Sequence, residues 1–124
     1  RKMILHYQAA AAIAALLGLV HSVLGEVKIL GPLDECRDIP KVMGSIEFTK
    51  RVIRFSWHVL TLLLLAVSAI LFSMDGAEDG QLEVSAVARI LSVAFFASSL
   101  TVLILTHARH FAWVVFLVLG ALTF

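Results

Sequence analysis

The chain has 124 residues, of which 60% are hydrophobic, and its mean hydropathy is +0.98. Soluble domains contain roughly 45–50% apolar residues, so this composition excludes an ordinary soluble domain and indicates an integral membrane protein. The formal net charge of +1 at pH 7 argues against nucleic acid as a partner, because the chain lacks the required excess of Lys and Arg.

Four apolar stretches predict an all-α fold, namely an integral membrane four-helix bundle with antiparallel, up-and-down spans. Residues 1–124 would then form a single transmembrane domain. The expected spans are about 3–24, 52–74, 84–106 and 111–124. The first three have the roughly 20 residues that a helix needs to cross the hydrocarbon core, whereas the fourth is short.

Small residues recur along the first span at spacings of four and three residues, which places them on one face of a helix. They are Ala11, Ala15, Gly18, Ser22 and Gly25. A seam of small residues lets a second helix approach closely in lipid, where helices have little hydrophobic drive to associate. We therefore expect the first span to be central in the bundle.

Residues 26–50 carry both prolines and charges of both signs, and they predict an amphipathic loop along the membrane surface. The lone cysteine, Cys36, falls in this loop and excludes an intramolecular disulfide or a CxxC redox pair. Seven of the ten basic residues lie on the loop side of the four spans, so the positive-inside rule places the loop in the cytoplasm. These seven are Lys28, Arg37, Lys41, Lys50, Arg51, Arg54 and Arg109.

The other two connections are predicted to be short. Residues 75–83 hold two glycines among polar residues, which is typical of a turn. Residues 107–110 link the third and fourth spans so briefly that these helices are expected to be antiparallel neighbours. Arg89, about one turn inside the third span, is expected to extend its side chain outward toward the headgroups.

A polar stripe opens the second span. Its members, Glu47, Arg51, Arg54 and His58, are four, three and four residues apart and share one helix face. Such a stripe is costly against lipid, so its inner end is expected in the protein interior. We expect His58 to face His21 there, with Arg54 and Glu47 closing the cytoplasmic end of the same pocket.

The predicted topology brings four histidines to the loop side of the membrane, together with Glu26. Imidazole and carboxylate suit a transition metal, and two facing imidazoles suit haem b, in either case for redox chemistry. The candidate metal ligands are His21, His58, Glu26, His107 and His110. The candidate cofactor-binding residues are His21, His58 and Arg54.

The same residues have a simpler interpretation, because His, Trp and Arg are common at membrane interfaces. The alternative function is a non-catalytic accessory or structural subunit that packs through the small-residue seam. Its partners would be membrane lipids and a larger membrane complex or further copies of itself. A small multidrug exporter is disfavoured, because the first span has no acidic residue within the membrane. No residue carries a catalytic assignment, and the sequence leaves open whether the protein is an enzyme.

Three segments resemble a known group of proteins. They are HSVLGE at 21–26, RFSWH at 54–58 and the closing segment 110–117. Together they resemble small, uncharacterised bacterial four-helix membrane proteins that share an HSxLGE-type motif. The resemblance covers most of the chain and implies a four-span fold in a bacterial inner membrane, but it implies no activity.

Overall fold

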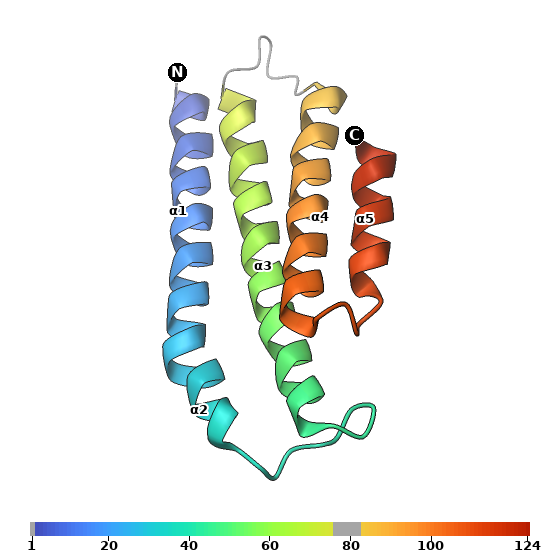
Figure 1. The fold of residues 1–124 in the computed structure, drawn as a ribbon. Coiled ribbons are helices and arrows are strands. Elements are labelled where there is room, and N and C mark those ends of the chain that lie inside the picture. The colour runs from blue at the N-terminus through green and yellow to red at the C-terminus, as the bar shows by residue number, and fades with distance from the viewer. Residues whose placement is uncertain (1, 76–82) are drawn as a thin grey trace.

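The computed structural model describes residues 2–75 and 83–124, and helices account for most of them (Figure 1). In chain order they are α1 (Lys2–Gly25), a π-helical turn (Glu26–Leu30), α2 (Gly31–Glu35), α3 (Ile46–Asp75), α4 (Val84–Thr106) and α5 (Ala112–Thr123). The turn predicted between the second and third spans falls on residues 76–82, which lie outside the described residues.

Three helical stretches are long and apolar enough to cross a membrane, namely His6–Glu35, Ile46–Met74 and Val84–Thr106. The 12 residues of α5 extend about 18 Å, less than the ~30 Å hydrocarbon core. The prediction of an all-α membrane bundle is therefore confirmed, with three helices of full spanning length and a shorter fourth.

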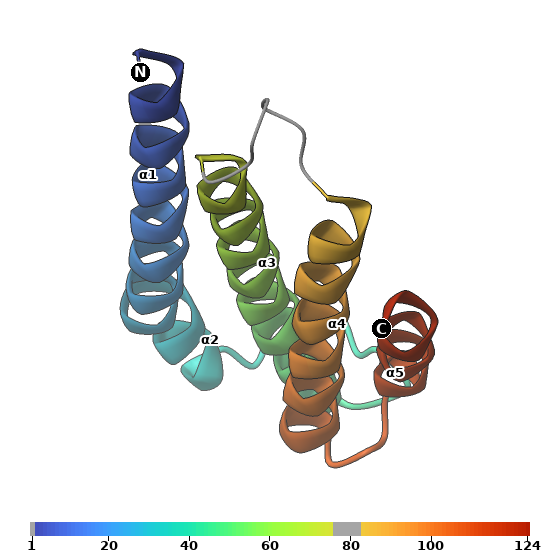
Figure 2. The same cartoon turned by 90° about the horizontal axis from the view of Figure 1, so that it is seen from above.

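The helices α1, α3, α4 and α5 pack as a row, in which each helix contacts the next (Figure 2). The prediction that the first helix is central is wrong, because α1 lies at one end of this row. Among the long helices α1 packs on α3, which its small residues face. Large apolar side chains such as Ile13 and Leu16 remain exposed on its other faces. These faces are suited to lipid.

The small-residue seam of α1 does lie against α3. Ala11 and Gly18 are buried, and the Ser68 hydroxyl of α3 donates a 2.7 Å hydrogen bond to the Ala11 carbonyl. A Cβ atom at Gly18 would lie 3.3 Å from the Leu64 Cβ, tighter than an ordinary contact. Close approach of the two helices therefore depends on the small residues, as the spacing predicts.

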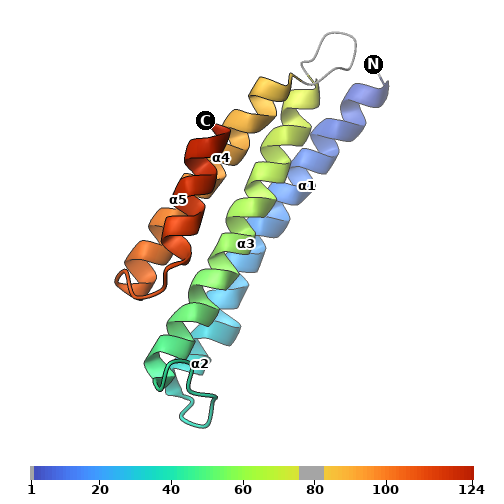
Figure 3. The ribbon, with the colours of Figure 1, turned by 90° about the vertical axis from the view of Figure 1, so that its right-hand side faces the viewer.

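The segment predicted as a loop over residues 26–50 is instead largely helical. The π turn and α2 continue α1 to Glu35, and α3 begins at Ile46, six residues before the expected position 52. The Ser45 hydroxyl caps α3 by accepting a 3.2 Å hydrogen bond from the Phe48 N–H. As a result, the α1–α3 pair extends beyond the turn that joins α4 to α5 (Figure 3).

The remaining connection, residues 36–45, is held against the start of α3 by one buried side chain. The Thr49 hydroxyl donates to the Pro40 carbonyl and accepts from the Val42 N–H, both at 2.8 Å. Gly44 takes a φ of +76°, a conformation that glycine adopts at little cost and that lets the chain turn into α3.

Hydroxyl groups of α4 bind the backbone of α5. Ser92 donates to the Gly120 carbonyl and Ser99 to the Trp113 carbonyl, each at 2.7 Å. A Cβ atom at Gly120 would lie 2.8 Å from the Phe96 ring, so the glycine permits this close approach. The turn between the two helices is tight and contains residues with positive φ, His107 and Ala108.

Candidate functional site

A polar network joins the end of α1, the π turn and α2 to one face of α3. We call it the His58 network, and its members are Ser22, Glu26, Asp34, Arg54, His58 and Thr61. Arg54 and His58 lie four residues apart on α3 and therefore share a face. Glu26 is the first residue of the π turn, and π turns inside helices frequently occur at functional sites.

The Arg54 guanidinium holds this part of the chain together. Its Nε lies 3.1 Å from Glu26 Oε1, and its Nη2 lies 2.9 Å from Asp34 Oδ2 and donates to the Leu30 carbonyl at 3.3 Å. The Arg54 side chain is 23% exposed, whereas the Glu26 and Asp34 side chains are 45% and 51% exposed. The cation is therefore largely covered, and its two carboxylates reach the surface.

Both ring nitrogens of His58 have partners. Nδ1 lies 2.7 Å from the Ser22 hydroxyl, and Nε2 lies 3.5 Å from Glu26 Oε2. Thr61 donates its own hydroxyl hydrogen to Ser22 at 3.0 Å, so the Ser22 O–H is free to donate to Nδ1. This pattern places the hydrogen of a neutral His58 ring on Nε2, facing the carboxylate.

His21 faces Trp57 rather than His58. The two rings stack with centroids 4.5 Å apart and planes within 1°, and Trp57 Nε1 donates a 2.9 Å hydrogen bond to the His21 carbonyl. Gly25 makes room for the indole, because a Cβ atom there would lie 1.9 Å from Trp57 Nε1. The Nε2 atom of His21 is buried and has no hydrogen-bond partner within the described part of the chain.

His110 belongs to a separate aromatic cluster beside α5. Its ring lies against those of Phe48, Phe55 and Phe111, with centroids 4.9–5.9 Å apart. Nδ1 of His110 accepts a 3.2 Å hydrogen bond from the Ala112 N–H at the start of α5. This ring is therefore explained by packing and by capping.

The predicted metal ligands are not assembled into one site. His107 is exposed at the end of α4, His110 packs among phenylalanines, and His21 stacks on Trp57. Across residues 2–75 and 83–124, no group of three or more His, Cys, Asp and Glu is placed to hold a metal ion. The physical reason is that His58 lies on the side of α3 that faces α1, whereas His110 packs on Phe48 and Phe55 elsewhere on α3.

Several residues of the site were not expected from the sequence. Asp34, not Glu47, pairs with Arg54, while Glu47 is exposed and lies 3.7 Å from Lys50. Lys50 is only 6% exposed, and its ammonium donates to the Asp34 carbonyl. Lys50 lies four residues before Arg54, and this spacing was the available signal that both cations share a face.

Comparisons with protein families, curated proteins and solved structures find no match. The resemblance to the HSxLGE group therefore stays a prediction, and the geometry alone bears on function.

The His58 network forms a continuous polar path between the buried hydroxyl of Thr61 and the half-exposed carboxylate of Asp34. Ser22, His58, Glu26 and Arg54 lie between these ends, and each contacts the next. Side chains from α1, the π turn, α2 and α3 all take part in it. The arrangement therefore binds the end of α1, the π turn and α2 to one face of α3.

Proposed function

We propose that this chain is a non-catalytic structural or accessory protein of the membrane, in which the His58 network fixes the end of α1, the π turn and α2 on α3. The observation that carries the proposal is the pair of contacts to the ring, Ser22 at Nδ1 and Glu26 at Nε2. A hydroxyl group accepts a hydrogen bond as readily as it donates one, and a carboxylate accepts from either form of the ring. The same partners therefore serve neutral imidazole and imidazolium.

His58 shares Glu26 with Arg54, because His58 lies at Oε2 and Arg54 at Oε1 of that carboxylate. Arg54 also binds Asp34 and the Leu30 carbonyl, so it holds the π turn and α2 as well. Neighbouring side chains on one face of α3 therefore fix three consecutive segments, namely the end of α1, the π turn and α2.

A hydrolytic role for Ser22, His58 and Glu26 is not favoured, although these residue types also occur in nucleophilic catalysis. Ser22 lies inside the continuous helix α1, where each backbone N–H is bonded to the carbonyl four residues earlier. Acyl transfer needs free donors that stabilise an oxyanion, and the amides beside Ser22 are already occupied.

Thermal unfolding in detergent and hydrogen exchange test the proposal, with His58→Ala as the variant. We expect His58→Ala to lower the unfolding temperature and to raise exchange near Ser22 and Glu26, because both side chains lose a partner. His107→Ala is the control, because His107 is exposed at the end of α4. Unchanged stability and exchange in His58→Ala contradict the proposal.

A second candidate function is a redox protein that holds haem or a metal ion. It is supported by the buried Nε2 of His21, which finds no hydrogen-bond partner among residues 2–75 and 83–124 and carries a lone pair or a hydrogen in need of one. Pairing with His58 requires that ring to give up Ser22 or Glu26. The test measures the metal and haem content of wild type, His21→Ala and the control His110→Ala. Equal content in all three proteins contradicts this candidate, and so does the absence of metal and haem from wild type.

We further propose that the protein lies in a bacterial inner membrane with the loop over residues 36–45 in the cytoplasm. The support is the seven of ten basic residues on that side. Cys36 is exposed in this loop and reports on the topology. An impermeant thiol reagent should label Cys36 only after the cells are permeabilised, and labelling of intact cells would reverse the orientation.

A further inference from the structure

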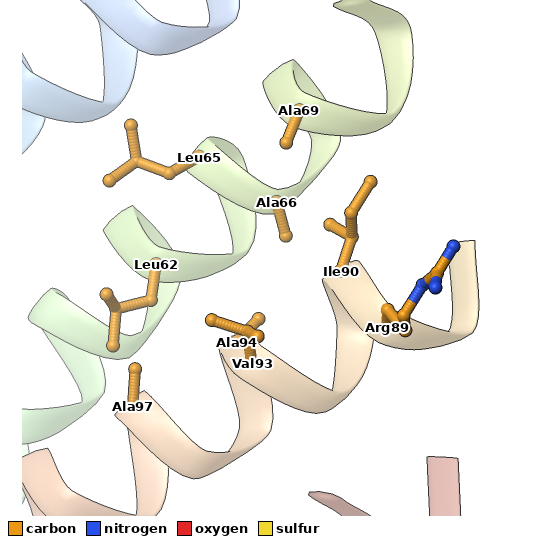
Figure 4. A pocket seen from close by; sticks show the side chains of 9 residues that line it. All are labelled: Leu62, Leu65, Ala66, Ala69, Arg89, Ile90, Val93, Ala94 and Ala97. Carbon is orange, nitrogen blue, oxygen red and sulfur yellow. The ribbon is translucent and has the colours of Figure 1, made fainter. Parts of the chain in front are cut away.

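A cavity of about 370 Å³ lies between α3 and α4, away from the His58 network (Figure 4). Its size is within the ~300–1,000 Å³ typical of pockets for small molecules. Four alanines create the space, Ala66 and Ala69 on α3 and Ala94 and Ala97 on α4, because their side chains end at Cβ. The larger residues that complete the lining are aliphatic, with the exception of Arg89.

Arg89 is the only charged side chain that lines this cavity among the residues that the structure describes, and it lies at the end nearest the start of α4. It is exposed, and within residues 2–75 and 83–124 it forms neither an ion pair nor a hydrogen bond. A guanidinium next to hydrocarbon needs an anion or water to offset the cost of its charge. The cavity therefore combines an apolar length with one positive end.

We infer that this cavity binds an anionic phospholipid, with an acyl chain along the alanines and the headgroup phosphate at Arg89. Arg89 lies five residues after Val84, about 7–8 Å along the helix axis, so its long side chain reaches headgroup depth. Guanidinium groups bind phosphate through paired N–H donors. A zwitterionic headgroup carries a cationic group beside its phosphate, so its net charge is zero and its attraction to the Arg89 guanidinium is weaker.

The test is native mass spectrometry of the protein from nanodiscs that contain equal amounts of phosphatidylglycerol and phosphatidylcholine. We expect wild type to retain phosphatidylglycerol about fivefold more often, the ratio that one cation near an anionic leaflet supplies. Arg89→Gln abolishes this preference. Arg109→Gln is the matched control, because Arg109 is an exposed arginine in the turn at the opposite end of α4.

A second variant tests the apolar part of the cavity. Ala94→Leu fills the space and lowers retention of both lipids, while Ala69→Leu does the same from the more exposed edge if Ala94→Leu does not fold. The inference is overturned if wild type retains phosphatidylglycerol no more often than phosphatidylcholine, as Arg89→Gln is expected to do. It is also overturned if wild type is a dimer that Ala94→Leu dissociates while lipid retention stays unchanged, because a second copy of the chain then occupies the cavity.

Discussion

The α1–α3 and α4–α5 pairs are both antiparallel and closely packed, yet different polar groups join them. Between α1 and α3 the Ser68 hydroxyl binds the Ala11 carbonyl, but most contacts involve a guanidinium, carboxylates, an imidazole and an indole, centred on Arg54, His58 and Trp57. Between α4 and α5 they are neutral, from the hydroxyls of Ser92 and Ser99 to backbone carbonyls.

The difference follows from where each set lies along the helices. The charged groups gather at the end of the α1–α3 pair that carries the π turn and α2, and their carboxylates are about half exposed. Ser92 is fully buried within α4, where a charge would be far more costly than a hydroxyl bonded to a carbonyl. Depth in the membrane thus selects the chemistry that joins two helices.

The largest effect is expected from Gly25→Ala, which breaks the α1–α3 contact. The new Cβ would lie 1.9 Å from Trp57 Nε1, so the indole must leave both the His21 ring and its carbonyl. We expect a loss of about 1–3 kcal/mol, as for other overpacked sites, measured by thermal unfolding in detergent. Gly18→Ala, where the nearest atom is 3.3 Å away, should lose much less, and equal losses would show that the indole is not held as described.

A smaller effect is expected from Arg54→Gln, which leaves the Glu26 and Asp34 carboxylates without their cation. We expect the free energy of unfolding to fall by about 1–2 kcal/mol, because charged hydrogen bonds contribute roughly 1.5–3 kcal/mol when buried and less when half exposed. Arg51→Gln, on the same helix, is the control for loss of a charge. Hydrogen exchange should rise selectively in α2, and unchanged exchange there would contradict the role of Arg54.

The α4–α5 pair is tested by Ser92→Ala, which removes the 2.7 Å bond to the Gly120 carbonyl. Hydrogen bonds between helices in membranes contribute about 0.6 kcal/mol, so the loss should be near that value. Ser98→Ala is the matched control, since Ser98 is equally buried but bonds to Ala94 in its own helix. A loss as large as that of Arg54→Gln would remove the distinction between the two pairs.

The spans could be predicted from the sequence because each is a long apolar run, and length alone decides whether a helix can cross the bilayer. Their ends could not. Pro32 was interpreted as a loop residue, but it lies in the first turn of α2, where a missing N–H costs little. Ser45 carried the signal for an earlier start of α3, since serine is a preferred capping residue.

Half of the candidate site was within reach of sequence patterns. Helical spacing correctly placed Arg54 and His58 on one face, and Glu26 lies against His58 as expected. The partners of His21 and Arg54 depend on the rotation of α1 and α2 against α3, which a pattern within one helix does not contain. The position of His110 beside Phe48 and Phe55 likewise depends on how separate helices pack, which a pattern within one helix does not contain.

The π turn over Glu26–Leu30 accommodates extra chain within a continuous helix. The Gly31 N–H bonds to the Glu26 carbonyl five residues back, so this turn holds one residue more than an α-helical turn would. Deleting one residue here would let the turn close to α-helical geometry and keep Asp34 near Arg54, whereas one further residue would rotate everything that follows by about 100°. A single deletion should therefore be tolerated between Glu26 and Leu30, while an insertion should be tolerated only between Cys36 and Ser45.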